Sequence, residues 1–111
     1  MKLTKRQYIM SKGKKLSKEK IIDFLKERKG ELQERFGVTK IGLFGSFSRN
    51  SENKSSDIDI AVELESENKF RTFFELKYYL EENFARQVDL GIESTLKKEI
   101  KESISKDIIY V

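Results

Sequence analysis

Two aspartates separated by one residue, Asp57 and Asp59, are the first candidates for chemistry in this sequence. They begin a stretch, residues 57–64, in which apolar residues occupy every second position. This alternation predicts a half-buried strand, and its period of two places both carboxylates on one face. Such carboxylates repel each other unless a positive group lies between them, and paired Mg²⁺ ions are the usual solution in phosphoryl chemistry. Taken alone, the pair also fits the polar outer face of a strand.

A third carboxylate, Asp89, lies in a short predicted strand at residues 87–90. Val88 and Leu90 point to one face of this strand, and Asp89 points to the other. Asp89 is therefore a candidate to complete a triad with the aspartates of the strand at 57–64, although by itself it is an ordinary acidic residue.

Gly45 and Ser46 end another predicted strand, residues 38–44. Glycine lets the backbone approach a phosphate closely, and the unpaired N–H groups at a helix start favour an anion. The turn at residues 45–50 is expected to lead into a short helix. Gly-Ser turns after strands are common, so this feature alone is a weak indication of phosphate binding.

The composition limits what else could catalyse a reaction. The 111 residues include no His and no Cys, which excludes an imidazole base, a thiol nucleophile and a His- or Cys-ligated zinc site. Carboxylates with magnesium are the natural remaining combination. The absence of Cys makes a reducing cytoplasm the simplest expected location. No apolar run of about 18 residues or more is present, so no membrane span is expected.

Hydrophobic periodicity predicts the elements that must position these side chains. Helices are expected over residues 18–36, 70–84 and about 96–104, and strands over residues 38–44, 57–64, 87–90 and 107–111. This order predicts an α+β fold, with a small mixed β-sheet packed by helices.

Aromatic residues crowd the predicted helix at 70–84. We expect them to belong to the hydrophobic core rather than to a base-stacking platform. The core stripe is Phe73, Leu76, Leu80 and Phe84, with Phe70, Phe74, Tyr78 and Tyr79 around it.

Charge divides the chain into two parts. Residues 1–20 carry eight Lys or Arg against a single Glu, whereas the rest of the chain is mildly acidic. We therefore predict a basic N-terminal arm over residues 1–16 and one folded domain over residues 17–111. The arm is expected to be a solvated, disordered tail, or else an electrostatic contact with RNA or an acidic partner. Met10 is an alternative start to Met1.

The joint pattern is more specific than its parts. Gly45-Ser46, ten intervening residues, Asp57-x-Asp59 and a later strand aspartate resemble the signature of the DNA polymerase beta-like nucleotidyltransferases. The chain from residue 17 to residue 111 is similar in length and element order to the minimal nucleotidyltransferases of that superfamily. The resemblance implies a nucleotidyltransferase palm-like fold.

Two positions depart from the family pattern. Asn50 stands where Gly often follows the motif arginine, and Ser48 stands where Ala is common. Asn tolerates the left-handed backbone conformation, so the turn is expected to survive.

The resemblance also implies roles for the candidate residues. Asp57 and Asp59 would hold two Mg²⁺ ions, and Asp89 would ligate the catalytic ion and help to deprotonate the acceptor hydroxyl. Gly45 and Ser46 would contact the β- and γ-phosphates of ATP. Arg49 would either add a charge-assisted phosphate contact or serve as a surface charge.

The activity implied is in-line attack of a hydroxyl on the α-phosphate, with release of pyrophosphate. The chain has no room for an acceptor-binding domain, so the acceptor is expected on a second protein. Minimal nucleotidyltransferases of this kind are commonly antitoxins that add AMP to a tyrosine of a HEPN-domain ribonuclease toxin. The alternatives are an inactive homologue or binding module that neutralises its partner by docking alone, and an RNA-tailing enzyme that uses the basic arm.

Overall fold

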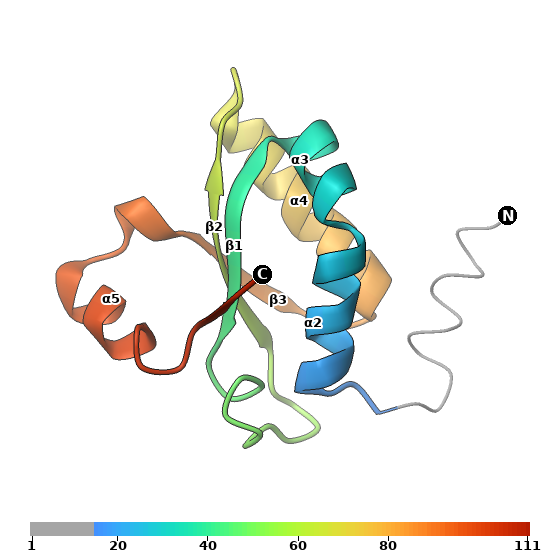
Figure 1. Cartoon of the computed structure of the whole chain (residues 1–111), viewed down its shortest axis with the longest axis vertical. Helices are drawn as coiled ribbons and strands as arrows, with labels where there is room; N and C mark the ends of the chain where they lie inside the picture. The colour runs from blue at the N-terminus through green and yellow to red at the C-terminus, as the bar shows by residue number, and fades with distance from the viewer. Residues whose placement is uncertain (1–14) are drawn as a thin grey trace, which may run out of the picture.

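A computed structural model describes residues 15–111, which form a four-stranded sheet with helices packed on it (Figure 1). The helices are α2 (Lys18–Glu27), α3 (Lys29–Phe36), α4 (Lys69–Phe84) and α5 (Lys98–Ile104), with a 3-10 turn, η1 (Glu93–Thr95), before α5. The strands are β1 (Val38–Phe44), β2 (Ile58–Leu64), β3 (Val88–Ile92) and β4 (Ile109–Tyr110). The expected α+β class is confirmed. The predicted arm falls almost entirely outside the described residues.

The sheet has the strand order β3-β2-β1-β4. The β2–β3 pair is parallel, and the other two pairs are antiparallel, so the sheet is mixed as predicted. A parallel pair requires a crossover connection, and α4 supplies it between β2 and β3. The crossover places the start of β3 beside the start of β2.

The helices α2, α3 and α4 cover one face of the sheet, and α5 lies on the opposite side (Figure 1). Ile58, Ile60 and Val62 of β2 point toward the three helices and are fully buried in the core. Because side chains alternate along a strand, Asp59 and Ala61 point to the other face. The core therefore fixes the register of the strand that carries the candidate aspartates.

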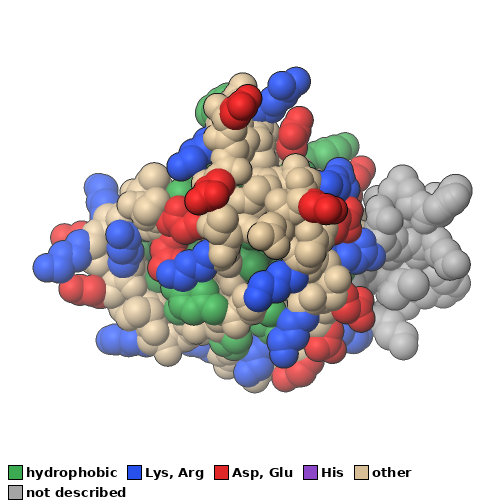
Figure 2. All heavy atoms as spheres, turned by 45° about the horizontal axis from the view of Figure 1, so that its top comes forward, with side chains coloured by type: hydrophobic (Ala, Val, Ile, Leu, Met, Phe, Trp, Pro, Cys, Tyr) green, Lys and Arg blue, Asp and Glu red, His purple; other side chains and the backbone are tan. Residues whose placement is uncertain are grey.

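Charges of both signs are interspersed on the face drawn in Figure 2. Lys and Arg side chains alternate there with Asp and Glu side chains instead of forming one continuous basic surface. Within residues 15–111, none of the helices combines the length and the apolar character that crossing a membrane requires.

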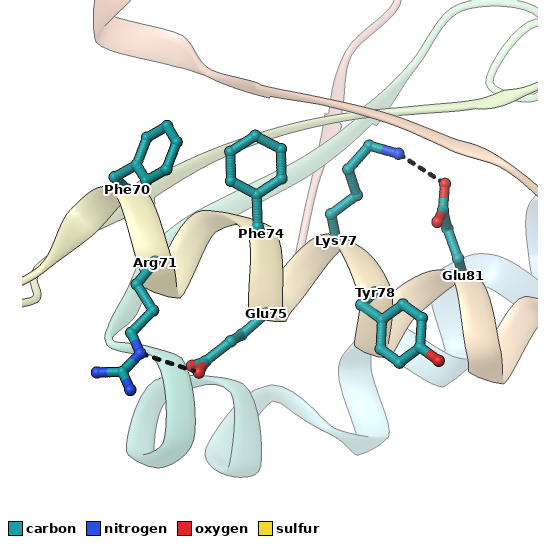
Figure 3. A pocket seen from close by; sticks show the side chains of 7 residues that line it. All are labelled: Phe70, Arg71, Phe74, Glu75, Lys77, Tyr78 and Glu81. Atoms are coloured by element: carbon teal, nitrogen blue, oxygen red, sulfur yellow. Dashed lines mark hydrogen bonds and ion pairs between the residues drawn. The ribbon is translucent and has the colours of Figure 1, made fainter.

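Three of the aromatic residues on α4 are not in the core, which corrects the sequence prediction. Phe70 is 77% exposed, Phe74 is 50% exposed and Tyr78 is 65% exposed. Figure 3 shows Phe70 and Phe74 on one side of α4 and Tyr78 on another. The predicted core stripe itself is confirmed, since Leu76, Leu80 and Phe84 are buried and Phe73 packs partly buried against the core. Tyr79 is buried with them. The prediction failed for these three residues because aromatic residues occupy several faces of α4, whereas only one face of the helix packs against the sheet.

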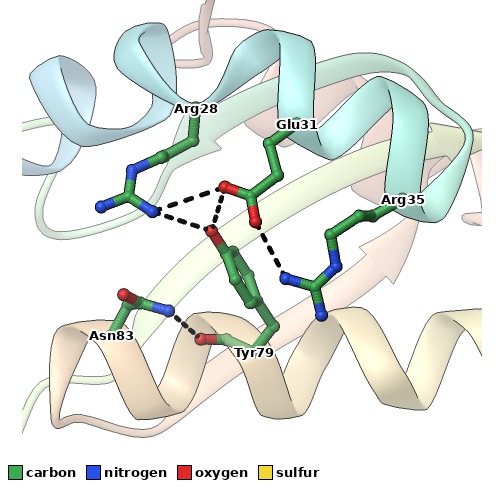
Figure 4. A network of polar contacts seen from close by, with 5 residues as sticks. All are labelled: Arg28, Glu31, Arg35, Tyr79 and Asn83. Atoms are coloured by element: carbon green, nitrogen blue, oxygen red, sulfur yellow. Dashed lines mark hydrogen bonds and ion pairs between the residues drawn. The ribbon is translucent and has the colours of Figure 1, made fainter. Parts of the chain in front are cut away.

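The single helix predicted over residues 18–36 is also wrong, because it is broken at Arg28. Arg28 leaves helical geometry with φ −98° and ψ 8°. Its guanidinium donates to Tyr79 Oη on α4 at 3.2 Å and to Glu31 at 3.4 Å, while Tyr79 donates to Glu31 at 2.9 Å (Figure 4). The break therefore lets one arginine tie the α2–α3 corner to α4.

The short helix expected after Gly45-Ser46 is absent. Residues 46–50 form hydrogen-bonded turns instead, with Arg49 N–H donating to the Gly45 carbonyl at 3.2 Å and Asn50 N–H to the Phe47 carbonyl at 3.3 Å. Phe47 is 1% exposed and anchors this turn in the core. The candidate phosphate contact therefore depends on the turn itself and not on a helix terminus.

Candidate active site

Asp59 and Asp89 lie side by side on β2 and β3, where the parallel register pairs them directly. Paired residues of neighbouring strands send their side chains to the same face. Burial, together with the negative charges of the nearby Asp89 and Asp57, raises the pKa of Asp59 to about 6. Arg49 opposes this rise with its positive charge. The structure therefore brings two of the three predicted carboxylates into contact.

Asp57 lies just before β2, and its side chain is exposed. Within residues 15–111, no three His, Cys, Asp or Glu side chains converge as the ligands of one metal ion. The donor chemistry still fits a hard divalent cation, since carboxylate oxygens are its preferred ligands. A bound cation would also relieve the repulsion that raises the pKa of Asp59. The three-carboxylate metal site stays a prediction.

Gly45 lies against the carboxylate of Asp59. Its φ of +80° falls in the left-handed region, and a Cβ on this residue would overlap the Asp59 carboxyl group. Glycine is therefore required here both by backbone conformation and by space. The turn and the carboxylate pair form one continuous site.

The two departures from the family pattern both fit the turn. Asn50 adopts φ 59°, so the expected tolerance of the left-handed conformation is confirmed. The Ser48 hydroxyl is buried and donates to the Gly45 carbonyl at 2.9 Å. Ser46 accepts a hydrogen bond from the N–H of Ser51 at 2.9 Å through its own carbonyl. These bonds hold the turn beside the aspartates.

Arg49 contacts an acidic side chain in this structure. Its guanidinium donates to Asp107 Oδ2 at 2.7 Å, with about half of the arginine side chain exposed. Arg49 is also close enough to Asp59 to lower the pKa of that carboxyl. A phosphate contact by Arg49 would therefore compete with Asp107, and this role stays a prediction.

Two positioning residues were missed by the sequence analysis. Arg86 donates to the Ser56 carbonyl at 2.8 Å and stacks over Phe47, with 5.3 Å from its guanidinium carbon to the ring centroid. Glu81 of α4 accepts from the Val88 N–H at 3.0 Å. The first contact fixes the loop that leads into Asp57, and the second fixes the start of β3. Both contacts join residues that are far apart in the sequence or lie on different elements. A local spacing pattern therefore does not predict either of them.

The raised pKa of Asp59 predicts how the stability of the metal-free protein depends on pH. The Asp59 carboxyl has a pKa near 3.8 in the unfolded state and about 6 in the folded state, so the folded state holds its proton more tightly. The contribution of this proton to the free energy of unfolding is therefore complete below about pH 4 and is lost as the pH rises through 6. The melting temperature of Asp59→Asn minus that of the wild type should be near zero at pH 4 and reach a few degrees at pH 7.5 in EDTA.

Comparing the two proteins at each pH removes the contributions of other groups. Burial opposes ionisation of Glu31 and Glu81, but hydrogen bonds outweigh it and lower the pKa of both carboxyls. These two groups act equally in the wild type and the variant. A melting-temperature difference that stays constant between pH 4 and pH 7.5 would contradict the assigned environment of Asp59.

Comparison with known proteins identifies a matching domain family and similar chains. The family profile of the nucleotidyltransferase domain matches residues 18–111. The protein adenylyltransferase MntA of Thermococcus cleftensis is 41% identical over 96 residues, which cover 86% of this chain and 97% of that protein.

Solved structures share the fold. A structure described as a minimal nucleotidyltransferase has a TM-score of 0.73 at 25% identity, over 87% of this chain and 98% of that chain. A crystal structure of a toxin–antitoxin with AMP-PNP has a TM-score of 0.62 at 25% identity, over 86% of this chain and 72% of that chain.

Proposed function

Because this chain belongs to the nucleotidyltransferase domain family, we propose that it is a protein adenylyltransferase that transfers AMP from ATP to a partner protein. The acceptor is a tyrosine hydroxyl of a HEPN-type ribonuclease toxin, and the modification makes this chain its antitoxin. The similarity to MntA and to a toxin–antitoxin with AMP-PNP supports this proposal. The observation that carries it is the pairing of Asp59 with Asp89 beside Gly45.

The proposed site assigns a task to each side chain in the reaction. The acceptor oxygen bonds to the α-phosphorus of ATP, the bond from that phosphorus to the bridging oxygen breaks, and pyrophosphate leaves. Asp89, exposed on β3, accepts the hydroxyl proton as attack begins. Gly45 and Ser46 let the backbone of the turn lie against the β- and γ-phosphates.

Asp57, Asp59 and Asp89 are the residues that would hold two Mg²⁺ ions. When bound, these ions supply charge neutralisation on the triphosphate and lower the pKa of the acceptor hydroxyl. The protein's own contribution is to fix the carboxylates on neighbouring strands and to hold the turn against them.

Labelled ATP tests the proposed function directly. The full chain is incubated with Mg²⁺, the product of the neighbouring gene, and ATP labelled on either the α- or the γ-phosphate. We expect the partner to gain one or more AMP masses, with the α-label on a tyrosine, and we expect no transfer in EDTA. Label arriving only from the γ-phosphate, or none at all with Mg²⁺ present, would contradict AMP transfer to this partner.

A further inference from the structure

The strand that carries Asp89 has an open edge. Among residues 15–111, β3 pairs with β2 on one side and with no strand on the other. The Gln87 carbonyl accepts from the Ile58 N–H of β2 at 3.0 Å. Because successive backbone groups alternate in direction, the N–H and C=O groups of Val88 and Leu90 point away from β2.

The outward backbone groups of β3 are hydrogen-bonded within the chain near both ends of the strand. Glu81, itself paired with Lys77 at 2.7 Å, accepts from the outward N–H of Val88 at 3.0 Å. Leu90 is the next residue whose backbone points outward. At the next outward position, the Ile92 carbonyl accepts from the Thr95 hydroxyl at 2.8 Å. The position available for strand pairing is therefore Leu90, one residue beyond Asp89.

An apolar groove runs beside this part of the edge. It is lined by Phe70 and Phe74 of α4, by Leu90 and Ile92 of β3, and by Leu96. Figure 3 shows Phe70 and Phe74 on the same side of α4, with Tyr78 turned another way. The two rings contact each other edge to face, with centroids 5.0 Å apart, and stay largely exposed. They give the groove a preformed aromatic wall.

The charges on α4 favour a protein occupant. Arg71 pairs with Glu75 at 3.6 Å, and Lys77 pairs with Glu81 at 2.7 Å. These i,i+4 pairs neutralise the neighbouring turns of α4, and the lining of the groove itself includes one charged side chain, Lys69. The groove therefore offers mainly apolar contact, and a single lysine is a weak attraction for a nucleic acid.

The area of the groove argues against a second copy of this chain held by the aromatic wall alone. An aromatic side chain buries about 150–250 Å² at most, so Phe70 and Phe74 together fall well short of the roughly 800 Å² per partner in a stable interface. An occupant needs further contacts, and the backbone of β3 next to the groove provides them.

We propose that an extended segment of the acceptor protein pairs with β3 at Leu90 as a fifth strand of the sheet. This inference rests on the proposed function and identifies how that site receives its substrate. Strand addition supplies main-chain hydrogen bonds, and alternating side chains supply specificity. One side chain of the segment enters the Asp89 face and carries the hydroxyl, and its two neighbours along the segment are apolar and enter the groove against Phe70 and Phe74.

The register makes this arrangement productive. Neighbouring strands lie about 4.8 Å apart, so the added strand extends the row in which Phe44, Asp59 and Asp89 are already paired. The acceptor hydroxyl then reaches the carboxylates from the edge of the sheet, while the turn at Gly45 lies on the opposite side of Asp59 from β3.

Charge substitution in the groove tests the inference. We expect Phe74→Glu to raise the KM for the product of the neighbouring gene by about tenfold or more, with little change in kcat or in slow ATP turnover without partner. Phe70→Ser, a milder change, should act in the same direction. Ile100→Glu is the matched control, since Ile100 is a 45% exposed apolar residue on α5. Partner binding should also slow hydrogen exchange at the Leu90 amide.

The outcomes separate this inference from the proposed function. AMP transfer by Phe74→Glu with an unchanged KM, or an unprotected Leu90 amide in the complex, overturns the docking site and leaves the function standing. If the wild type binds the partner without transferring AMP, and Phe74→Glu no longer binds it, the docking site is supported and the proposed function is refuted. A partner that neither binds nor accepts AMP refutes both.

Discussion

Replacing Asp57 and Asp59 together with asparagine is expected to abolish AMP transfer while leaving the fold intact. Each carboxylate is expected to contribute a factor of about 10² to 10³ to the rate, as groups that stabilise developing charge commonly do. The two act on the same ions, so the double variant should lose about 10³-fold and not the product of both factors. The measurement is the initial rate of α-label transfer to the partner, with unfolding followed in parallel.

The double variant also separates catalysis from docking. Asp23→Asn is a matched control, because Asp23 is an exposed carboxylate on α2. It is also far in sequence from β2 and β3, which carry the paired aspartates. It should transfer AMP like the wild type. If the double variant is inactive in transfer but still neutralises the partner's ribonuclease, the chain acts as a binding module and the catalytic proposal is wrong.

The strand that carries Asp59 could be predicted because buried and polar positions alternate along its sequence. Apolar residues alternate from Ile58 to Leu64, and burial of one face fixes the facing of every side chain. The pairing of Asp59 with Asp89 needed one more step, the parallel crossover, which the order of strand, helix and strand indicates. Local pattern and strand order therefore indicate that Asp59 and Asp89 lie side by side, whereas a joint metal site with Asp57 stays a prediction.

The features that failed depend on contacts between distant residues. The helix break at Arg28 is held by Tyr79, which lies 51 residues away, and the spacing around Arg28 continues a helical pattern. The exposure of Phe74 depends on how far the sheet edge extends beside α4, since aromatic residues occupy more than the buried face. Each of these features is set by packing, which single-sequence periodicity does not record.

Gly45→Ala is expected to have the second largest effect, on both stability and catalysis. A side chain at φ +80° is strained by about 1–2 kcal/mol, and the added Cβ would overlap the Asp59 carboxylate. Relief of that overlap must displace either the turn or Asp59, and a displacement of about 1 Å at a reacting centre costs about 10²-fold in rate. Urea unfolding and initial rates of AMP transfer measure the two effects.

Gly30 provides the matched control for this substitution, because it lies in α3 and a Cβ added there would meet nothing within 4 Å. Gly30→Ala should stabilise the protein by about 0.5–1 kcal/mol, since alanine favours a helix over glycine, and should leave AMP transfer unchanged. Both substitutions add the same methyl group, so a difference between the two variants reports the backbone conformation and the space at each position. Wild-type transfer by Gly45→Ala would mean that the turn does not hold Asp59 in its catalytic position.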